Sequence, residues 1–457
     1  MGPMTTIIRA YKYRAFPPKD AHDDFDRAID LKRALWKRLI EIEDEYVSRK
    51  ATLMQAETFA AERATAEAIA DRGRRKIAFD AIKARRRDLA ATVKDDLMAL
   101  GSWRVDRQRE AKQAAAGAGL HWGDYNAVVF QFDGARSAAK ARGAKVYNFE
   151  AACGEALVNQ IMTGRRPAQL CTFAATKLSF IDDPRAARRK RGSHRSSYKL
   201  ARLDMTLRGP RNPLGPARFS LDFVMHRPLP PNTLVKEVRA IRTWRNVVNR
   251  DGQCFRRADW SVVFVLAVEV AARADRSCAG LALTWRGDDQ QDGLQVFALL
   301  YDSVTTKPLS MDYGYEADWK HRAELFRRAD SSGDGADRAA AEAFERRLLR
   351  TRQVAQRTAA AAIAKRYSCV AVQKIDLSSK GAKKHVAPAS FRLALRHALE
   401  ARGGTLIEVA APLDKTCENP HRAQAKILFA AAREHLSATK MSAPQPSKDE
   451  TSESVAA

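Results

Sequence analysis

Residues Cys278–Arg286 read CAGLALTWR, a short apolar run that follows a basic, loop-like segment and ends at charged residues. A run of this kind is typical of a buried β-strand. A second such run, SCVAVQKIDL at Ser368–Leu377, follows a long stretch with a helical pattern. We therefore predict that Cys278–Arg286 opens a new domain and that Ser368–Leu377 is a later strand of the same domain.

The segments around these two runs complete the predicted domain. Leu294–Tyr301 and Leu309–Tyr313 have the pattern of strands that form a three-stranded meander with the first run. Tyr315–Arg366 is almost continuously helical in pattern, with one break at Ser331–Gly335. The remaining predicted elements are the helix Ala389–Arg402, the strand Thr405–Ala410 and a last helix over roughly Pro420–Leu436. This order of elements is the skeleton of an RNase H/RuvC-like α/β domain.

The N-terminal part has a different organisation. Thr5–Phe16 alternates over part of a β-prone run and predicts a strand, and roughly the next hundred residues are helical in pattern. Further strands are predicted at Thr172–Ile181, Arg218–His226 and Ser261–Ala271, with Pro and Gly clusters between them. We expect a β-barrel in two parts with a helical insertion, the N-terminal strand being its edge or its centre.

The charge of the chain indicates a polyanionic partner. The 457 residues have a formal net charge of +26, which favours nucleic acid first and an anionic membrane surface second. No apolar run is long enough to span a bilayer, and the first residues lack the apolar core of a signal peptide. The six cysteines stand singly, without a CxxC pair, so a zinc ribbon and a disulfide framework are not expected. These features predict a reduced, cytoplasmic protein.

Basic residues are clustered at several places. Each cluster alone fits a solvated helix face, but together they predict a surface that follows phosphates. The densest run, Arg185–Arg195, also fits a nuclear-localisation signal, for which nothing else in the sequence argues. The predicted nucleic-acid-binding residues are Lys12, Arg14, Arg74, Arg75, Lys76, Arg85, Arg86, Arg87, Arg188, Arg189, Lys190, Arg191, Arg195, Arg242 and Arg245.

Several segments resemble one known family. They are YKYRAFPP at 11–18, MHRPLPPNTLVKEV at Met225–Val238, GLALTWR at 280–286, VAVQKIDLS at 370–378 and APASFRLALRHALEARGGTLIEVAA at 387–411. In this order they resemble the type V CRISPR effectors, most of all the miniature subtype M effectors, which are related to the transposon-encoded TnpB nucleases. The resemblance touches nearly the whole chain and is strongest from Met225 to Ala411.

The resemblance implies an α+β multidomain architecture. A split wedge β-barrel would hold the guide RNA, an inserted helical recognition lobe would grip the guide–target duplex, and a RuvC/RNase H-like α/β domain would follow. The implied domains are the N-terminal wedge strand at 1–19, the helical lobe at 20–143, the wedge domain at 144–275, the RuvC-like domain at 276–411 with its long helical segment at 315–366, a C-terminal RuvC helix at 412–436 with a reduced or absent zinc-binding insertion, and a disordered tail at 437–457.

The acids of the family's nuclease site are missing. Its first-strand Asp would fall at Ala282, its Glu before Lys-Ile-Asp-Leu at Gln373, and its third acid near Pro420. Two-metal cleavage needs carboxylates that hold two divalent ions about 4 Å apart, and a methyl group or a carboxamide cannot replace them. No catalytic metal is therefore expected. Cys417 and His421 have the spacing of half a zinc site, but a structural role is several times more frequent for such a pair.

The leading hypothesis is an RNA-guided DNA-binding effector that silences its target by R-loop formation and occupancy, without DNA cleavage. Its partners would be a guide RNA, target double-stranded DNA and a recruited effector protein, with no membrane. One alternative is a ribonuclease that processes its own guide RNA without metal, with candidates such as Lys190, His194 and His226. A second is a nuclease-dead, TnpB-derived transcriptional repressor, and a third is a nonspecific RNA-binding protein.

Overall fold

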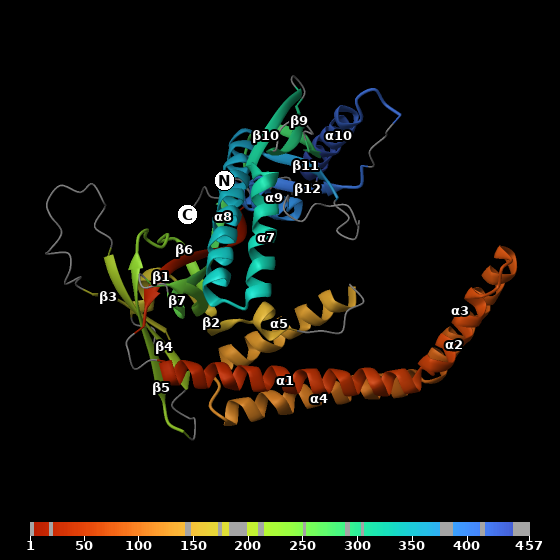
Figure 1. Cartoon of the computed structure of the whole chain (residues 1–457), viewed down its shortest axis with the longest axis horizontal. Helices are drawn as coiled ribbons and strands as arrows, with labels where there is room; N and C mark the ends of the chain where they lie inside the picture. Colours follow the sequence, from red (N-terminus) through yellow and green to blue (C-terminus); the bar gives the residue numbers. More distant parts are fainter. Residues whose placement is uncertain are drawn as a thin grey trace, which may run out of the picture. The chain divides into compact units, whose positions relative to one another are not determined.

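The computed structural model describes residues 4–17, 22–141, 148–171, 176–181, 199–208, 214–249, 253–287, 293–302, 306–374, 387–411 and 416–441. The chain divides into two compact units, and each is considered by itself. The first contains residues 1–8, 244–257 and 267–457, and the second contains residues 9–243 and 258–266. The chain is thus a mixed α+β protein (Figure 1).

The strand predicted from CAGLALTWR is β8 (Cys278–Gly287), at the centre of the smaller sheet. Within the described residues this sheet has five strands in the order β10-β9-β8-β11-β12. Strands β9 (Gly293–Tyr301) and β10 (Thr306–Tyr315) continue the antiparallel meander. Strands β11 (Cys369–Gln373) and β12 (Thr405–Val409) are parallel to β8 and to each other. The predicted meander and the two later strands are confirmed.

Helices cover both faces of this small sheet. Helices α8 (Gly335–Arg366) and α9 (Pro388–Glu400) pack on one face, where they share an apolar core with β8 and β11. Helix α10 (Pro420–Met441) packs on the other face. Helix α7 (Glu316–Ser332) runs beside α8 (Figure 1), and the predicted break between them is confirmed. Because α10 continues to Met441, the prediction of disorder from residue 437 was wrong for residues 437–441.

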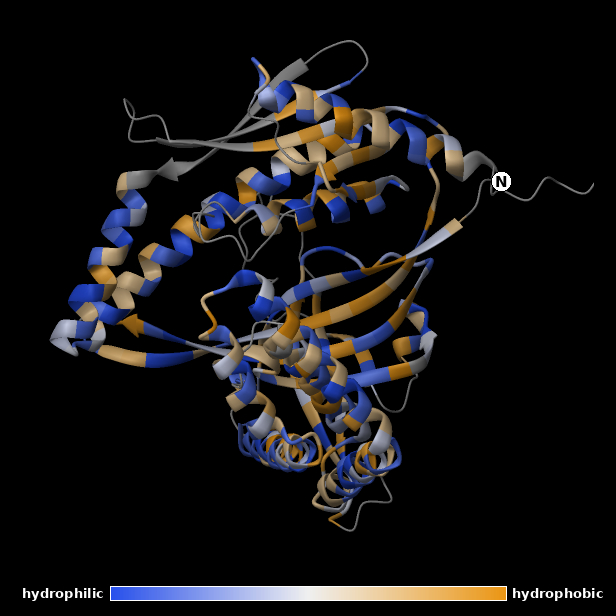
Figure 2. Ribbon diagram, turned by 90° about the vertical axis from the view of Figure 1, so that its right-hand side faces the viewer, coloured by the Kyte–Doolittle hydropathy of each residue, from blue (hydrophilic) through white to orange (hydrophobic). Residues whose placement is uncertain are grey.

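The larger sheet belongs mainly to the second unit. Its strand order in the described residues is β2-β6-β7-β1-β5-β4-β3. Hydrophobic and hydrophilic residues both occur along the strands of the chain (Figure 2). The N-terminal strand is β1, inside the sheet between β7 and β5. The bounds are β1 Met4–Phe16, β2 Glu155–Arg165, β3 Thr176–Ile181, β4 Lys199–Arg208, β5 Ala217–Met225, β6 Thr233–Val248 and β7 Cys254–Ala271. Of these, β2, β4 and β6 were not predicted.

The predicted β-barrel is not closed by backbone pairing in the described residues, because β2 and β3 remain the two edges of the sheet. The edges do meet through side chains. The buried Asn159 of β2 donates a hydrogen bond from Nδ2 to Oγ1 of Thr176 on β3, at 3.0 Å. The large sheet is therefore an open sheet whose edge strands touch at one buried polar contact.

The predicted helical segment is present in the second unit. It consists of α1 (His22–Leu53), α2 (Ala56–Glu67), α3 (Arg72–Thr92), α4 (Lys94–Gly117) and α5 (Trp122–Ala141), followed by the short α6 (Phe149–Ala152) and a 3₁₀ turn at Pro167–Cys171. Helices α1, α4 and α5 share a core that includes Leu39, Ala111 and Phe132. Helices α2 and α3 follow at the far end of α1 (Figure 1).

Buried polar contacts attach the helices to β2. Nζ of Lys32 on α1 lies 3.2 Å from Oδ1 of Asp124 on α5, and the same oxygen accepts a hydrogen bond from the backbone N of Val158 at 2.8 Å. Gly123 permits this approach, because a Cβ atom there would collide with the carbonyl oxygen of Val158. The start of α5 is therefore held directly against the backbone of β2.

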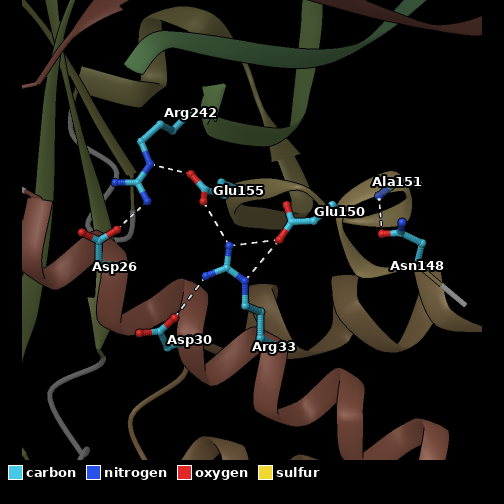
Figure 3. A network of polar contacts seen from close by, with 8 residues as sticks. All are labelled: Asp26, Asp30, Arg33, Asn148, Glu150, Ala151, Glu155 and Arg242. Atoms are coloured by element: carbon cyan, nitrogen blue, oxygen red, sulfur yellow. Dashed lines mark hydrogen bonds and ion pairs between the residues drawn. The ribbon is translucent and has the colours of Figure 1, made fainter. Parts of the chain in front are cut away.

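A second network fixes α1 on the same strand (Figure 3). The guanidinium of Arg33 contacts Asp30, Glu150 and Glu155 at 3.0–3.1 Å. Glu155 also accepts a hydrogen bond from Nε of Arg242 at 2.6 Å. Arg242 completes the network through an ion pair with Asp26 of α1.

Candidate nucleic-acid interface and nuclease-like centre

The first candidate site lies on the α10 face of the small sheet. Ala282 of β8 is fully buried in an apolar cluster whose other members are Cys369, Ala371, Ala411, Ala425, Leu428 and Ala432. Val372 of β11 pairs in parallel register with Leu281 of β8. The next residue of β11, Gln373, therefore lies level with Ala282 and faces the same side of the sheet.

Pro420 begins the helix that covers this face. Helix α10 approaches β8 so closely that a Cβ atom on Gly280 would overlap the backbone of Ala425 and Phe429. Gln424, one turn after Pro420, donates a hydrogen bond from Nε2 to the carbonyl oxygen of Ala411 at 2.5 Å, just beyond the end of β12. Ala282 and Gln373 thus lie on one face of the sheet, and Pro420 begins the helix that covers this face.

The residues at these positions do not fit a pair of divalent cations. Ala282 supplies a methyl group, Gln373 a neutral carboxamide and Pro420 an aliphatic ring, whereas such ions need several carboxylate ligands. In the part of the chain that the structure describes, no three His, Cys, Asp or Glu side chains come together as a possible metal site. Cys417 and His421 are among the described residues and belong to no such group.

An acid on the neighbouring strand β12 lies on the wrong face to substitute for the missing carboxylates. Glu408 of β12 pairs in register with Val372, whose side chain belongs to the core under α8 and α9. Its carboxylate contacts the guanidinium groups of Arg392 and Arg396 on α9, at 2.7 and 2.5 Å. Glu408 is therefore engaged on the face opposite Gln373. Asp288, Asp289 and Asp376 lie outside the described residues.

The second candidate site is the surface of α3. No residue of this helix is buried, and its start is fixed by Asp71, whose Oδ1 accepts the backbone N–H of Arg74 at 2.7 Å. Two of the predicted arginines, Arg75 and Arg85, contact other residues of the protein. Arg75 donates hydrogen bonds to the carbonyl oxygens of Ile69 and Ala70, at 2.8 and 3.1 Å. Arg85 forms an ion pair with Glu62 of α2.

Four of the six remaining cations of α3 form a stripe along the helix, and the other two, Arg74 and Arg86, are exposed outside it. At 100° per residue, the side chains of Arg72, Lys76, Lys83 and Arg87 project within an arc of about 60°, and all four are exposed. We call these four residues the α3 stripe. Asp80 lies beside it as one acid among four cations. Arg72 and Lys83 were not predicted, although helical spacing on the predicted helix would have identified them.

The other predicted residues differ in their surroundings. Lys12 and Arg14 project from β1 on its exposed side, while the intervening Tyr13 and the next residue Ala15 are buried. Arg86 is exposed on α3, and Arg245 of β6 is half-buried. Arg188, Arg189, Lys190, Arg191 and Arg195 lie outside the described residues.

Arg242 does not lie where a phosphate could reach it. Its side chain is 4% exposed and paired with Asp26 and Glu155, and its guanidinium lies 4.8 Å from the ring centroid of Phe25. Burial would lower the pKa of the Arg242 guanidinium, but the hydrogen bonds to Glu155 and Asp26 and their negative charges outweigh burial and raise that pKa. Its predicted role as a nucleic-acid contact is therefore replaced by a structural one.

His226, a candidate for metal-free RNA processing, is exposed and packs its ring 5.2 Å from that of the buried Tyr13. Lys190 and His194 are not among the described residues. Among the described helices, none is long and apolar enough to cross a membrane.

Comparison with known proteins places these sites in context. No protein-family model matches the chain. The sequence is similar to that of a CRISPR-associated DNA-binding protein. That protein is Cas12m from Pelobacter propionicus, 26% identical over 371 residues, which cover 68% of this chain and 54% of the relative. The chain thus spans about half the length of the curated relative it matches. The similarity supports the resemblance to subtype M effectors drawn from the motifs.

Proposed function

We propose that this protein is an RNA-guided DNA-binding effector that acts by occupying its target and does not cut it. The observation that carries the proposal is the nature of the residues on the α10 face of the small sheet. A sheet of order β10-β9-β8-β11-β12 fits a RuvC-like domain, and its ligand positions hold Ala282 and Gln373. This combination supports a RuvC-like domain that contributes to binding and lacks the carboxylates that cleavage requires.

The positive charge supports the nucleic-acid part of the proposal. The net charge is +26, and the α3 stripe, Lys12 and Arg14 present cations to solvent. Cations that neutralise phosphates release counterions and so supply affinity without reading sequence. In such effectors the sequence is read by the guide RNA through base pairing. The relative from Pelobacter propionicus is itself named a DNA-binding protein.

Occupancy alone is sufficient for silencing in this scheme. Strand exchange between guide and duplex is nearly balanced, so basic contacts to the backbone are enough to tip it toward a stable R-loop. A bound R-loop would obstruct a polymerase without any bond being cut. A guide RNA and target double-stranded DNA are therefore the partners we propose, and no catalytic metal is needed.

The proposal is tested with the full chain, its co-purified RNA sequenced and resynthesised, and a matched DNA duplex. We expect a gel shift that requires the matching guide, and intact DNA after incubation with Mg²⁺. Magnesium-dependent cutting that persists through repurification would refute the non-cleaving part. Binding of any duplex without guide would favour a nonspecific nucleic-acid-binding protein. Trimming of precursor RNA in the presence of EDTA would show that the protein also processes its guide RNA without metal.

A further inference from the structure

The charge of helix α8 changes about a third of the way along its length. Up to Glu345, acids and bases are mixed and paired, as in the contacts of Glu345 with Arg322 of α7 and of Glu342 with Arg338. From there to the end of the helix the sequence contains no Asp or Glu. The same stretch contains seven cations, which are Arg346, Arg347, Arg350, Arg352, Arg357, Lys365 and Arg366.

Four of these seven cations have partners within the protein. The partners are Glu342 for Arg346, the ring of Phe344 for Arg347, the ring of Trp319 for Arg352, and Asp302 for Arg366. The other three cations are Arg350, Arg357 and Lys365. Their side chains make no ion pair, hydrogen bond or ring contact within the part of the chain that the structure describes. Their charge is therefore available to a ligand.

The three unpaired cations lie along one side of the helix. At 100° per residue, Arg350, Arg357 and Lys365 project within an arc of about 80°. Val354 and Ala361 project within the same arc and separate the cations along the helix. All five residues are exposed, and Val354 is 57% exposed. We call Arg350, Arg357 and Lys365 the α8 stripe.

The stability of the helix does not account for the α8 stripe. The helix dipole favours cations only in the last turn, and of the stripe residues only Lys365 is there. Arg350 and Arg357 lie more than two turns before the end of the helix. A helix face that is merely solvated alternates charges of opposite sign, which support each other three or four residues apart. Because this face contains cations alone, we expect an anionic ligand to cover it.

The residues around the cations favour the backbone of a double helix as that ligand. Surfaces that bind unpaired bases present aromatic rings for stacking, whereas the exposed residues between the stripe cations are Val354 and Ala361. A helix that lies on a membrane needs large apolar residues beside its cations, and these positions offer only one. Duplexes, by contrast, are held mostly through their phosphates. From Arg350 to Lys365 the stripe is about 22 Å long, enough for several phosphates.

We propose that the α8 stripe binds the phosphate backbone of a double-helical segment of the bound nucleic acid. Each of the three cations would face a phosphate, and the short side chains of Val354 and Ala361 would let the backbone approach the helix closely. This inference rests on the proposed function, since it assumes a nucleic-acid partner. It assigns binding to Arg350, Arg357 and Lys365, which the basic clusters in the sequence did not include.

Val354 allows a test that does not weaken the fold. Val354→Glu places an acid four residues after Arg350 and three before Arg357, where it can pair with both and support the helix. The probe is a fluorescein-labelled RNA–DNA hybrid of about 20 base pairs, titrated with the full chain. We expect Val354→Glu to weaken hybrid binding about tenfold while the melting temperature is unchanged or higher. Val354→Gln, which adds similar size without charge, should bind within about twofold of the wild type.

Two double variants separate the stripe from net charge. Arg350→Gln/Arg357→Gln and Arg352→Gln/Arg366→Gln each remove two positive charges from α8, but Arg352 and Arg366 project at least about 100° away from the stripe and have partners. We expect the first variant to bind the hybrid several-fold more weakly and to reduce the slope of log K against log salt by about 2. The second should stay within about twofold of the wild type. Arg350→Lys/Arg357→Lys keeps both charges and should keep the slope.

The outcomes separate this inference from the proposed function. The DNA strand of the hybrid, used alone, is the single-stranded probe, and we expect Arg350→Gln/Arg357→Gln to weaken its binding by less than about twofold. Equal losses for the hybrid and the single strand, or for the two double variants, would overturn the inference and leave the proposed function standing. Loss of binding to phosphatidylserine vesicles with unchanged hybrid affinity would identify a membrane face and also overturn it. A wild-type protein that binds neither the hybrid nor guided DNA would overturn both. Circular dichroism confirms that each variant is folded.

Discussion

Nζ of Lys32 lies 3.2 Å from Oδ1 of Asp124, and the two side chains are 1% and 2% exposed. The residues are 92 positions apart in sequence and join α1 to α5. Lys32 also donates to the carbonyl oxygen of Ala156 on β2. A buried pair of this kind is costly to break, because removing one partner leaves the other charge without compensation.

We therefore expect Asp124→Asn to lower the free energy of unfolding by about 3–5 kcal/mol. The double variant Lys32→Met/Asp124→Asn should recover part of that loss, because no charge then remains buried. Urea titration of the wild type, both single variants and the double variant measures the coupling. Strictly additive losses would show that the two charges do not depend on each other.

The pH dependence of stability should reflect His121. Burial lowers the pKa of His121 below its ordinary 6.5, and the negative charge of Asp124 opposes this in part. The unfolded chain therefore binds a proton before the folded chain does, so stability is present above about pH 6.5 and is lost as the pH falls. Protonation would also displace the hydrogen bond that Nδ1 of His121 accepts from the backbone N of Gly123 at 3.2 Å.

Thermal unfolding at about pH 7.5 and 5.5 measures this effect. His121→Asn keeps an acceptor at the start of α5 without a titrating ring, and its melting temperature should fall less on acidification. An equal fall in both proteins would assign the pH dependence to other groups.

The α3 stripe should dominate the salt dependence of nucleic-acid binding by this helix. Replacing Lys76 and Lys83 by Gln should reduce the slope of log K against log salt by about 1 for each phosphate that the helix no longer neutralises. Replacing Arg85 by Gln removes the same charge from a residue already paired with Glu62, and we expect a smaller change. Binding to a DNA duplex in the presence of guide RNA, titrated with KCl, is the measurement. Equal slopes for all variants would exclude α3 from the interface.

Restoring acids to the nuclease-like centre should destabilise the protein rather than activate it. Ala282→Asp places a carboxylate at a fully buried position among apolar side chains, at an expected cost of about 3 kcal/mol or more. Adding Gln373→Glu should still give no DNA cleavage with Mg²⁺, because Pro420 offers no third carboxylate. Ala282→Ser is the control for size without charge. Stabilisation of the double variant by Mg²⁺, or cutting, would contradict this prediction.

The sequence identified the small sheet better than the large one, for physical reasons. β8 and β11 are buried on both faces and appear as continuous apolar runs bounded by polar residues. β4 and β6 alternate between the core and solvent, and basic residues occupy their outer positions. On β6, the positive charge of Arg242 and Arg245 was interpreted as part of a binding surface, and the period of two was not recognised. The alternating Ala201, Leu203 and Met205 of β4 carried the missing signal.

The candidate site, like the fold, could be predicted from the sequence only in part. Motif positions were enough to predict that Ala282 and Gln373 belong to one centre, because the strands that carry them are adjacent. Charge alone could not distinguish Arg242, which is buried, from Arg87, which is exposed. Whether an arginine faces solvent or a buried carboxylate depends on residues distant in sequence, here Asp26 and Glu155, and a local pattern does not contain that information.

The close approach of α10 to β8 at Gly280 also bears on how this protein could change over evolutionary time. A single hydrogen atom is all that the chain allows between that strand and the backbone of Ala425 and Phe429. Ala282, two residues further along the same strand, is fully buried under the same helix, so we expect a carboxylate there to require that α10 moves away from the sheet. We therefore expect single substitutions to charged residues at Ala282 to be selected against through loss of stability, so that this face of the sheet is one on which the chain can accept little change.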